Sequence, residues 1–172
     1  MIKIGQKPAT LDRPIEHLTA CHRRIEDRLS TLERAGEWFG SEDETKQAEA
    51  MQAIASAIRF LDSSGVTHTV DEESSLFPRL APRLDQGEKD YVESLERQHR
   101  EVDQAYAELK AAVDARAPDR YRAAVSRVAQ LYREHIVSED RVLTAIAGRH
   151  LSPADLEAIA AEMRGRRSHL AK

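Results

Sequence analysis

The sequence contains few of the residues that support a β-rich or disulfide-linked protein. It has a single cysteine, which excludes an internal disulfide framework and is typical of a reducing compartment. Aromatic residues make up only 5% of the chain, and there are seven glycines and six prolines. A β-sandwich or barrel would need more Val, Thr, aromatic and turn residues. The composition therefore argues against an all-β fold.

The sequence also lacks a strong charge bias and a long hydrophobic run. The 26 basic and 30 acidic residues leave a formal charge of −4, so we expect neither nucleic acid nor a membrane surface as a partner. No run approaches the ~18 apolar residues of a membrane span. Residues 1–13 hold no apolar stretch of signal-peptide length. We expect a cytoplasmic protein, and the sequence names no protein partner.

The residues that are present favour helices. Hydrophobic residues account for 41% and charged residues for 33% of 172 positions, which is typical of one helical domain. Helix breakers separate segments with helical periodicity. These segments cover residues 13–39, 42–80, 87–116, 118–147 and, more briefly, 153–165. The prediction is an all-α, antiparallel up-down-up-down four-helix bundle in a single domain, 1–172, with its core at about 11–147 and a short fifth helix and tail in 148–172.

Helix ends and one bend are also predicted from local patterns. Ser41 and Glu44 have the spacing of a capping box for the second helix. Ser152, with Pro153 after it and an acid at position 155, has the pattern of the start of the fifth helix. Gly65 follows two serines in the second helix, where we expect a kink.

Each of the four long helices has an apolar seam that is interrupted by one histidine. Residues spaced alternately three and four positions apart lie on the helix face that a bundle buries. On two of these seams a glutamate follows the histidine by four residues, which directs both side chains to the same spot. The candidate ligands are His22, His68, Glu72, His99, His135 and Glu139.

These six positions are predicted to lie at one height in the bundle. On neighbouring antiparallel helices, residues equally far from the connecting turn face each other. The midpoint of His99 and His135 falls at the break at 117, and that of Glu72 and His99 falls in the turn before position 87. The midpoint of His22 and His68 is residue 45, slightly past the helix break at residues 40–41. A kink at Gly65 would compensate for this mismatch.

Such a polar layer destabilises the core of a bundle unless it binds metal. An unpaired buried polar cluster costs several kcal/mol. A single seam histidine is more often an ordinary core residue, and a single His/Glu pair is usually surface chemistry, but their convergence favours metal. Six N and O ligands suit two first-row ions with bridging carboxylates and a water-derived oxygen between them. The absence of thiolate favours iron or manganese over structural zinc.

Several other residues lie near these positions. Glu26 and Asp103 each follow a seam histidine by four residues but lie on the flank, where they either accept a histidine N–H or are solvated charges. His17 is expected to be exposed, and Cys21 is a candidate packing residue. Tyr132 is interpreted as a core residue, with the alternative that it donates to an oxygen ligand at the metal.

The seam residues lie in recognisable motifs. Residues 68–78, HTVDEESSLFP, resemble the H-x-x-x-E-E-x-x-L-F-P signature of hemerythrin-like (HHE) cation-binding domains. Residues 97–101, RQHRE, and 134–143, EHIVSEDRVL, are similar to the third- and fourth-helix motifs of that family, and 20–25 to its first-helix ligand region. The resemblance covers about residues 11–147. It implies a non-haem di-iron centre with a bridging oxo or hydroxo group, and it carries the ligand role to the six residues above. Asp103 stands where the oxygen carriers of the family have a further histidine.

The leading functional hypothesis is a di-iron protein that binds or senses oxygen, nitric oxide or peroxide during metal, oxidative or nitrosative stress. One alternative is an oxidoreductase that consumes peroxide or nitric oxide, and another is an iron-binding or delivery protein. A metal-free interaction module is the non-metal alternative. Ferritin-type iron oxidation is disfavoured because that architecture uses two Glu-x-x-His units, whereas only Glu96 and His99 fit here.

Overall fold

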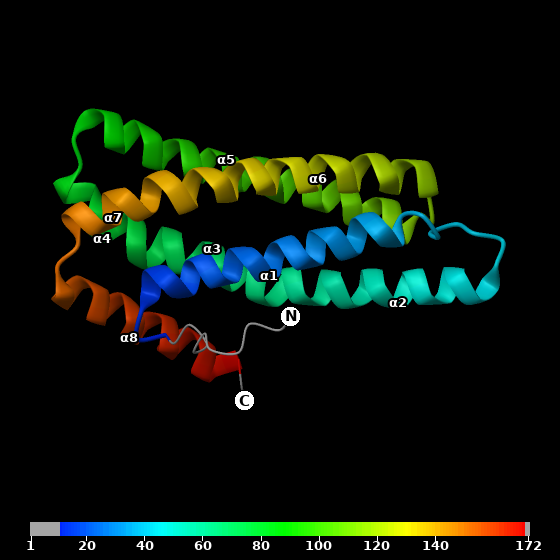
Figure 1. The fold of residues 1–172 in the computed structure, drawn as a ribbon, viewed down its shortest axis with the longest axis horizontal. Helices are drawn as coiled ribbons and strands as arrows, with labels where there is room; N and C mark the ends of the chain where they lie inside the picture. The colour runs from blue at the N-terminus through cyan, green and yellow to red at the C-terminus, as the bar shows by residue number, and fades with distance from the viewer. Residues whose placement is uncertain (1–10, 171–172) are drawn as a thin grey trace, which may run out of the picture.

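The computed structural model describes residues 11–170, which form helices joined by short turns (Figure 1). Residues 1–10, in which no signal peptide is predicted, lie outside this range. The first long rod is α1, and the third is α5. The second and fourth rods are composite. The elements are α1 Pro14–Ala35; α2 Glu44–Phe60, η1 Leu61–Gly65, α3 Val66–Asp71, η2 Glu72–Leu76, α4 Phe77–Leu80 and η3 Ala81–Arg83; α5 Gln86–Asp114; α6 Pro118–Ser138, η4 Glu139–Leu143 and α7 Thr144–His150; and α8 Pro153–Leu170.

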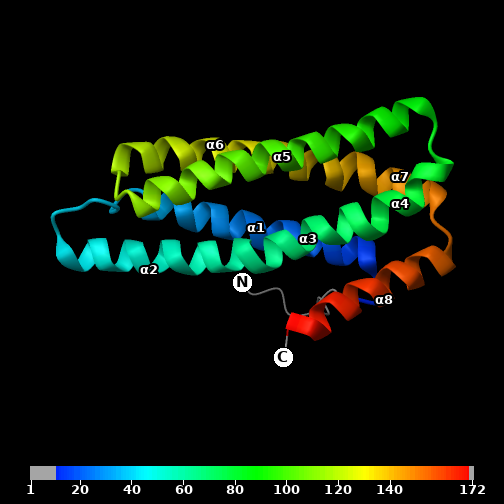
Figure 2. The same cartoon turned by 180° about the vertical axis from the view of Figure 1, so that it is seen from behind.

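The four rods run up and down side by side, and the prediction of an all-α antiparallel bundle with an added C-terminal helix is confirmed. Both views show α5 beside α6 and α1 beside α2 (Figures 1 and 2). The fifth helix is longer than the predicted span of 153–165, because it continues to Leu170 along the outside of the bundle. It packs against α1 and α3.

The capping predictions are partly correct. Ser152 caps α8, since its hydroxyl accepts from the N–H of Asp155 at 3.2 Å while the Asp155 carboxylate accepts from the Ser152 N–H at 2.9 Å. The capping box at Ser41 was wrong. Asp43 is the N-cap of α2, and its carboxylate accepts from the backbone of Thr45 and Lys46. An aspartate next to the first helical residue outcompetes the more distant serine.

Three π-helical turns interrupt the second and fourth rods. The turn Leu61–Gly65 occupies the place where we expected a kink at Gly65. A π turn inserts only one extra residue into an α-helix. The looser match between His22 and His68 comes mainly from α2, which extends past the end of α1 at their connection (Figure 1). The other two turns, η2 and η4, begin at Glu72 and Glu139, the two candidate carboxylate ligands.

The buried apolar residues form two separate clusters along the bundle. One includes Ile25, Leu109 and Val128 and fills the end where α1 joins α2. The other includes Leu95 and Leu143 and extends to α8. The buried histidines and glutamates lie between the two clusters, so the core is divided by a polar layer.

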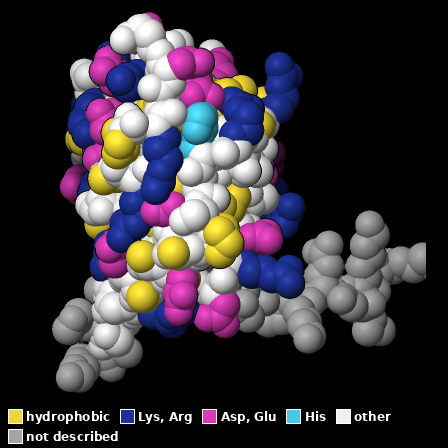
Figure 3. All heavy atoms as spheres, turned by 90° about the vertical axis from the view of Figure 1, so that its left-hand side faces the viewer, with side chains coloured by type: hydrophobic (Ala, Val, Ile, Leu, Met, Phe, Trp, Pro, Cys, Tyr) yellow, Lys and Arg dark blue, Asp and Glu magenta, His cyan; other side chains and the backbone are white. Residues whose placement is uncertain are grey.

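The outer surface at the α4, α7 and α8 end is a mixture of acidic and basic side chains with scattered apolar atoms (Figure 3). Ion pairs there join the helix ends, for example Arg149 to Glu88 at 2.6 Å and Arg83 to Asp155 at 3.1 Å. Within residues 11–170, no helix combines the length and the apolar character that crossing a membrane requires.

Candidate metal centre

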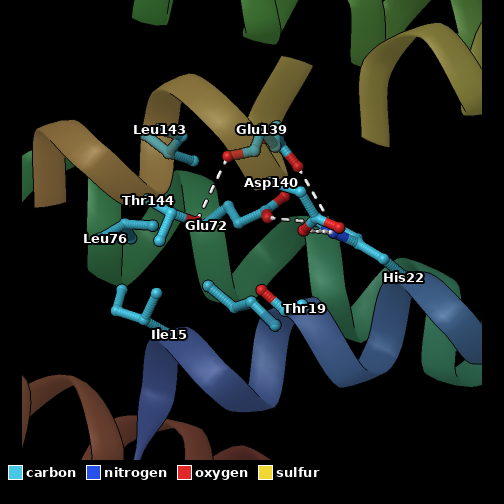
Figure 4. Close-up of a pocket in the computed structure, with 10 residues that line it drawn as sticks. Ile15, Thr19, His22, Glu72, Leu76, Glu139, Asp140, Leu143 and Thr144 are labelled. Atoms are coloured by element: carbon cyan, nitrogen blue, oxygen red, sulfur yellow. Dashed lines mark hydrogen bonds and ion pairs between the residues drawn. The ribbon is translucent and has the colours of Figure 1, made fainter. Parts of the chain in front are cut away.

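The structure brings all six sequence-predicted side chains together in the middle of the bundle. Each comes from a different turn of the four rods, and each is at most 4% exposed. The Nε2 atoms of His22 and His68 lie 3.1 Å apart, and those of His99 and His135 lie 3.0 Å apart. The carboxylates of Glu72 and Glu139 enter the same space, as Figure 4 shows from the side of the pocket lined by Ile15 and Thr19.

The ligand atoms form two overlapping groups that share both carboxylates. Within each group the donor atoms all lie within 4.8 Å of one another. Glu72 approaches His68 at 3.2 Å through one oxygen and His99 at 3.4 Å through the other. Glu139 approaches His22 at 3.1 Å and His135 at 3.2 Å. One group is His22, His68, Glu72 and Glu139; the other is Glu72, His99, His135 and Glu139.

The electrostatics of this layer fit a bound cation. Both oxygens of Glu72 and of Glu139 are buried without a hydrogen bond among the described residues. Burial, followed by the charge of Glu139, raises the pKa of Glu72 well above its usual value. Burial favours the neutral form of His22 too, but the three carboxylates of Glu139, Glu72 and Asp140 together outweigh it and raise the pKa of His22 to about 9. Two carboxylates facing each other in a dry core are costly unless positive charge compensates them.

Three of the four histidines are held by an acceptor on a neighbouring rod. The Nδ1 of His22 lies 2.7 Å from Asp140, that of His99 lies 2.8 Å from Glu73, and that of His135 lies 3.0 Å from Gln98. An Nδ1–H donated to such an acceptor leaves Nε2 free to bind metal. The Nδ1 of His68 has no hydrogen-bond partner among the described residues.

These acceptors are not the residues that sequence spacing suggested. Asp103 is exposed and Glu26 lies on the flank, and neither contacts a ring nitrogen in the described structure, which favours the solvated-charge alternative. A different sequence signal identifies the acceptors. Each is the immediate neighbour of a candidate ligand: Glu73 follows Glu72, Asp140 follows Glu139, and Gln98 precedes His99.

The prediction of an exposed His17 was wrong. Its side chain is only 8% exposed, although it is not among the clustered candidate ligands. The physical reason is that α8 extends further than expected and packs against α1. Cys21, one turn later, is buried as a packing residue should be, and burial raises the pKa of its thiol.

Two small hollows flank the layer, each with a volume of about 10 Å³. The first lies on the carboxylate side and is lined by Leu18, Leu76 and Leu143 among others. The second lies on the imidazole side, where Tyr132 and Val102 form part of the wall. A hollow of this size has room for about one water-sized molecule beside the layer.

The comparisons with known proteins agree with this arrangement. A family model described as the hemerythrin HHE cation-binding domain matches residues 13–147. No curated protein matches the chain. The matched segment contains the first three rods, the fourth rod except for its last three residues, and the complete polar layer, and it ends before α8. The chain therefore belongs to the hemerythrin HHE cation-binding family.

Proposed function

We propose that the polar layer holds two iron ions, each bound by two histidines and by both shared glutamates. The observation that carries the proposal is the pair of overlapping donor groups, since two ions would satisfy all four carboxylate oxygens that lack hydrogen bonds. Membership of a cation-binding family implies metal binding. The N and O donor set without thiolate favours iron. The proposed ligands are His22, His68, Glu72, His99, His135 and Glu139.

We further propose that the protein binds or senses a small ligand, namely oxygen, nitric oxide or peroxide, in metal, oxidative or nitrosative stress. With two histidines, two bridging carboxylates and a bridging oxo or hydroxo group, a six-coordinate iron retains one open position for such a ligand. The adjoining hollows are water-sized, which favours a ligand of only a few atoms. The single cysteine remains consistent with a cytoplasmic site of action.

Metal analysis of the chain loaded with iron tests the site. We expect about two irons per chain and a visible absorption spectrum in the wild type, and a loss of iron in His68→Ala. His150→Ala is the matched control, because His150 is a partly buried histidine that contacts Glu88 outside the layer. A colourless chain that binds no iron, or His68→Ala with undiminished iron, would refute the di-iron proposal.

Reaction with oxygen and peroxide separates the functional alternatives. Reversible spectral change on adding oxygen to the reduced protein supports ligand binding, whereas steady consumption of peroxide or nitric oxide supports the oxidoreductase alternative. If consumption persists in His135→Ala, the layer is not responsible for it. Iron that transfers readily to a chelator, with no change on adding small ligands, would favour iron binding and delivery.

A further inference from the structure

The hollow on the imidazole side has Tyr132 in its wall. The wall also includes the four layer histidines, apolar side chains such as Ile25 and Val102, and the polar side chains of Thr69 and Asp103. Tyr132 lies on α6, one turn before His135. Its ring packs against the apolar cluster of that half of the bundle, while its hydroxyl makes no hydrogen bond to any described residue.

The other three tyrosines show how unusual this is in the same bundle. Tyr91 donates to the Ser138 carbonyl at 3.0 Å, and Tyr121 donates to the Leu32 carbonyl at 2.9 Å. Tyr106 contacts Asp62 at 3.1 Å. Buried tyrosine hydroxyls usually form a hydrogen bond because an unpaired buried hydroxyl is costly. The Tyr132 oxygen is not among the fully buried atoms that lack a partner, so it is open to a partner from outside the chain, such as water or a small ligand in the hollow.

The neighbouring rod leaves this hydroxyl uncovered. Gly65 ends the π turn Leu61–Gly65, and a Cβ atom placed on it would lie 3.8 Å from the Tyr132 oxygen. Any longer side chain at position 65 would extend into this region. Burial and the charges of Asp103 and Glu72 raise the pKa of Tyr132 above its usual value. The phenol therefore keeps its proton at neutral pH and acts as a hydrogen-bond donor.

We propose that the Tyr132 hydroxyl donates a hydrogen bond to the small ligand at the metal centre and so favours ligands that carry negative charge. This inference rests on the proposed function. A neutral donor in the wall of a hollow of about 10 Å³ discriminates among small ligands by their capacity to accept a hydrogen bond. Oxygen and nitric oxide are both diatomic, so size alone would not separate them.

Azide binding to the oxidised, iron-loaded protein tests the inference. We expect Tyr132→Phe to retain its iron and to bind azide roughly tenfold more weakly, the loss typical of one hydrogen bond to a charged group. The infrared stretch of bound azide should shift between H₂O and D₂O in the wild type, and this shift should shrink in Tyr132→Phe. Tyr106→Phe is the matched control, since it removes a phenol that contacts Asp62 and does not line the hollow.

The outcomes distinguish this inference from the function on which it rests. If the iron-loaded wild type binds no azide, both the small-ligand proposal and the role of Tyr132 fail. If the wild type binds azide but Tyr132→Phe matches it in affinity and isotope shift, only the role of Tyr132 is overturned. If Tyr132→Phe loses iron, the infrared stretch of azide bound to the wild type is the remaining test. A stretch that does not change in D₂O excludes a donated hydrogen bond and overturns the role of Tyr132.

Discussion

At the scale of single residues, the polar layer is braced by the sequence neighbours of its own members. Glu73 reaches His99 on α5, and Asp140 reaches His22 on α1. In both cases two consecutive acidic residues have different roles, because adjacent helical side chains point about 100° apart. The first acid enters the layer, and the second holds a histidine of a neighbouring rod.

This bracing predicts different effects for two aspartates near the layer. Asp140→Ala removes the acceptor 2.7 Å from the His22 Nδ1, so we expect iron affinity to fall about 10- to 100-fold, the usual cost of losing such an outer partner. Asp103→Ala is the control, since Asp103 follows His99 by four residues but is exposed. Competition with a chelator measures both affinities. Equal affinities in the two variants would contradict the bracing role.

The candidate ligands were predictable from the sequence, whereas their acceptors were not. Seam periodicity identified all six positions that converge, because it depends only on regular helix geometry. Turn midpoints matched for Glu72, His99 and His135, whereas the midpoint of His22 and His68 was offset. Which neighbour contacts a ring nitrogen depends on the rotation of adjoining rods. The π turns that begin at Glu72 and Glu139 alter that rotation locally, and simple α-helical spacing does not contain them.

At the scale of elements, α8 is attached to the rod that carries two of the candidate ligands. The Asp71 carboxylate is completely buried and accepts from Arg166 at 2.7 Å and from Arg167 at 2.6 Å. Arg166 also donates to the buried hydroxyl of Ser75. Asp71 directly precedes Glu72, so α8, which lies beyond the family match, holds the backbone from which a proposed ligand projects.

Removing both arginines should therefore destabilise the bundle. In Arg166→Ala/Arg167→Ala the Asp71 carboxylate is left buried and unpaired, and we expect a loss of about 3 kcal/mol in the free energy of unfolding. Arg164→Ala is the control, because its ion pair with Asp12 is exposed and should contribute at most ~1 kcal/mol. Chemical denaturation of the metal-free proteins measures both losses. A double variant as stable as the control would show that this attachment is unimportant.

The length and contacts of α8 explain the main error in the predicted architecture. Its cap was readable from Ser152 and Asp155, but its amphipathic pattern is weak. Gly165 stands at the expected end and is typical of a helix stop, yet α8 continues through it to Leu170. The attraction between Asp71 and the two arginines joins residues 95 and 96 positions apart. Local sequence patterns do not report such distant pairing, and so the burial of His17 was missed as well.

At the scale of the whole molecule, the layer divides one bundle core into two apolar clusters. We expect this division to lower the stability of the metal-free chain. His22 and His135 partly compensate the charge of Glu139 and lower its pKa, whereas burial raises the pKa of Glu72. The buried Glu72 carboxyl therefore represents a cost that a purely structural bundle would not retain. A bound ion compensates that cost, and its binding free energy is added to the stability of the folded state. These glutamates are therefore expected to destabilise the metal-free chain and to stabilise the metal-bound chain.

Glu72→Met tests this opposition because methionine has a similar length and no charge. We expect the metal-free variant to be more stable than the metal-free wild type by about 1–3 kcal/mol, since a fully buried carboxyl without hydrogen bonds is replaced by an apolar group. Iron should raise the melting temperature of the wild type but leave that of Glu72→Met nearly unchanged. Glu93→Met, at an exposed position on α5, should keep the iron response. If metal-free Glu72→Met is instead less stable than the wild type, Glu72 supports the fold itself, and the cost that we assign to the layer is wrong.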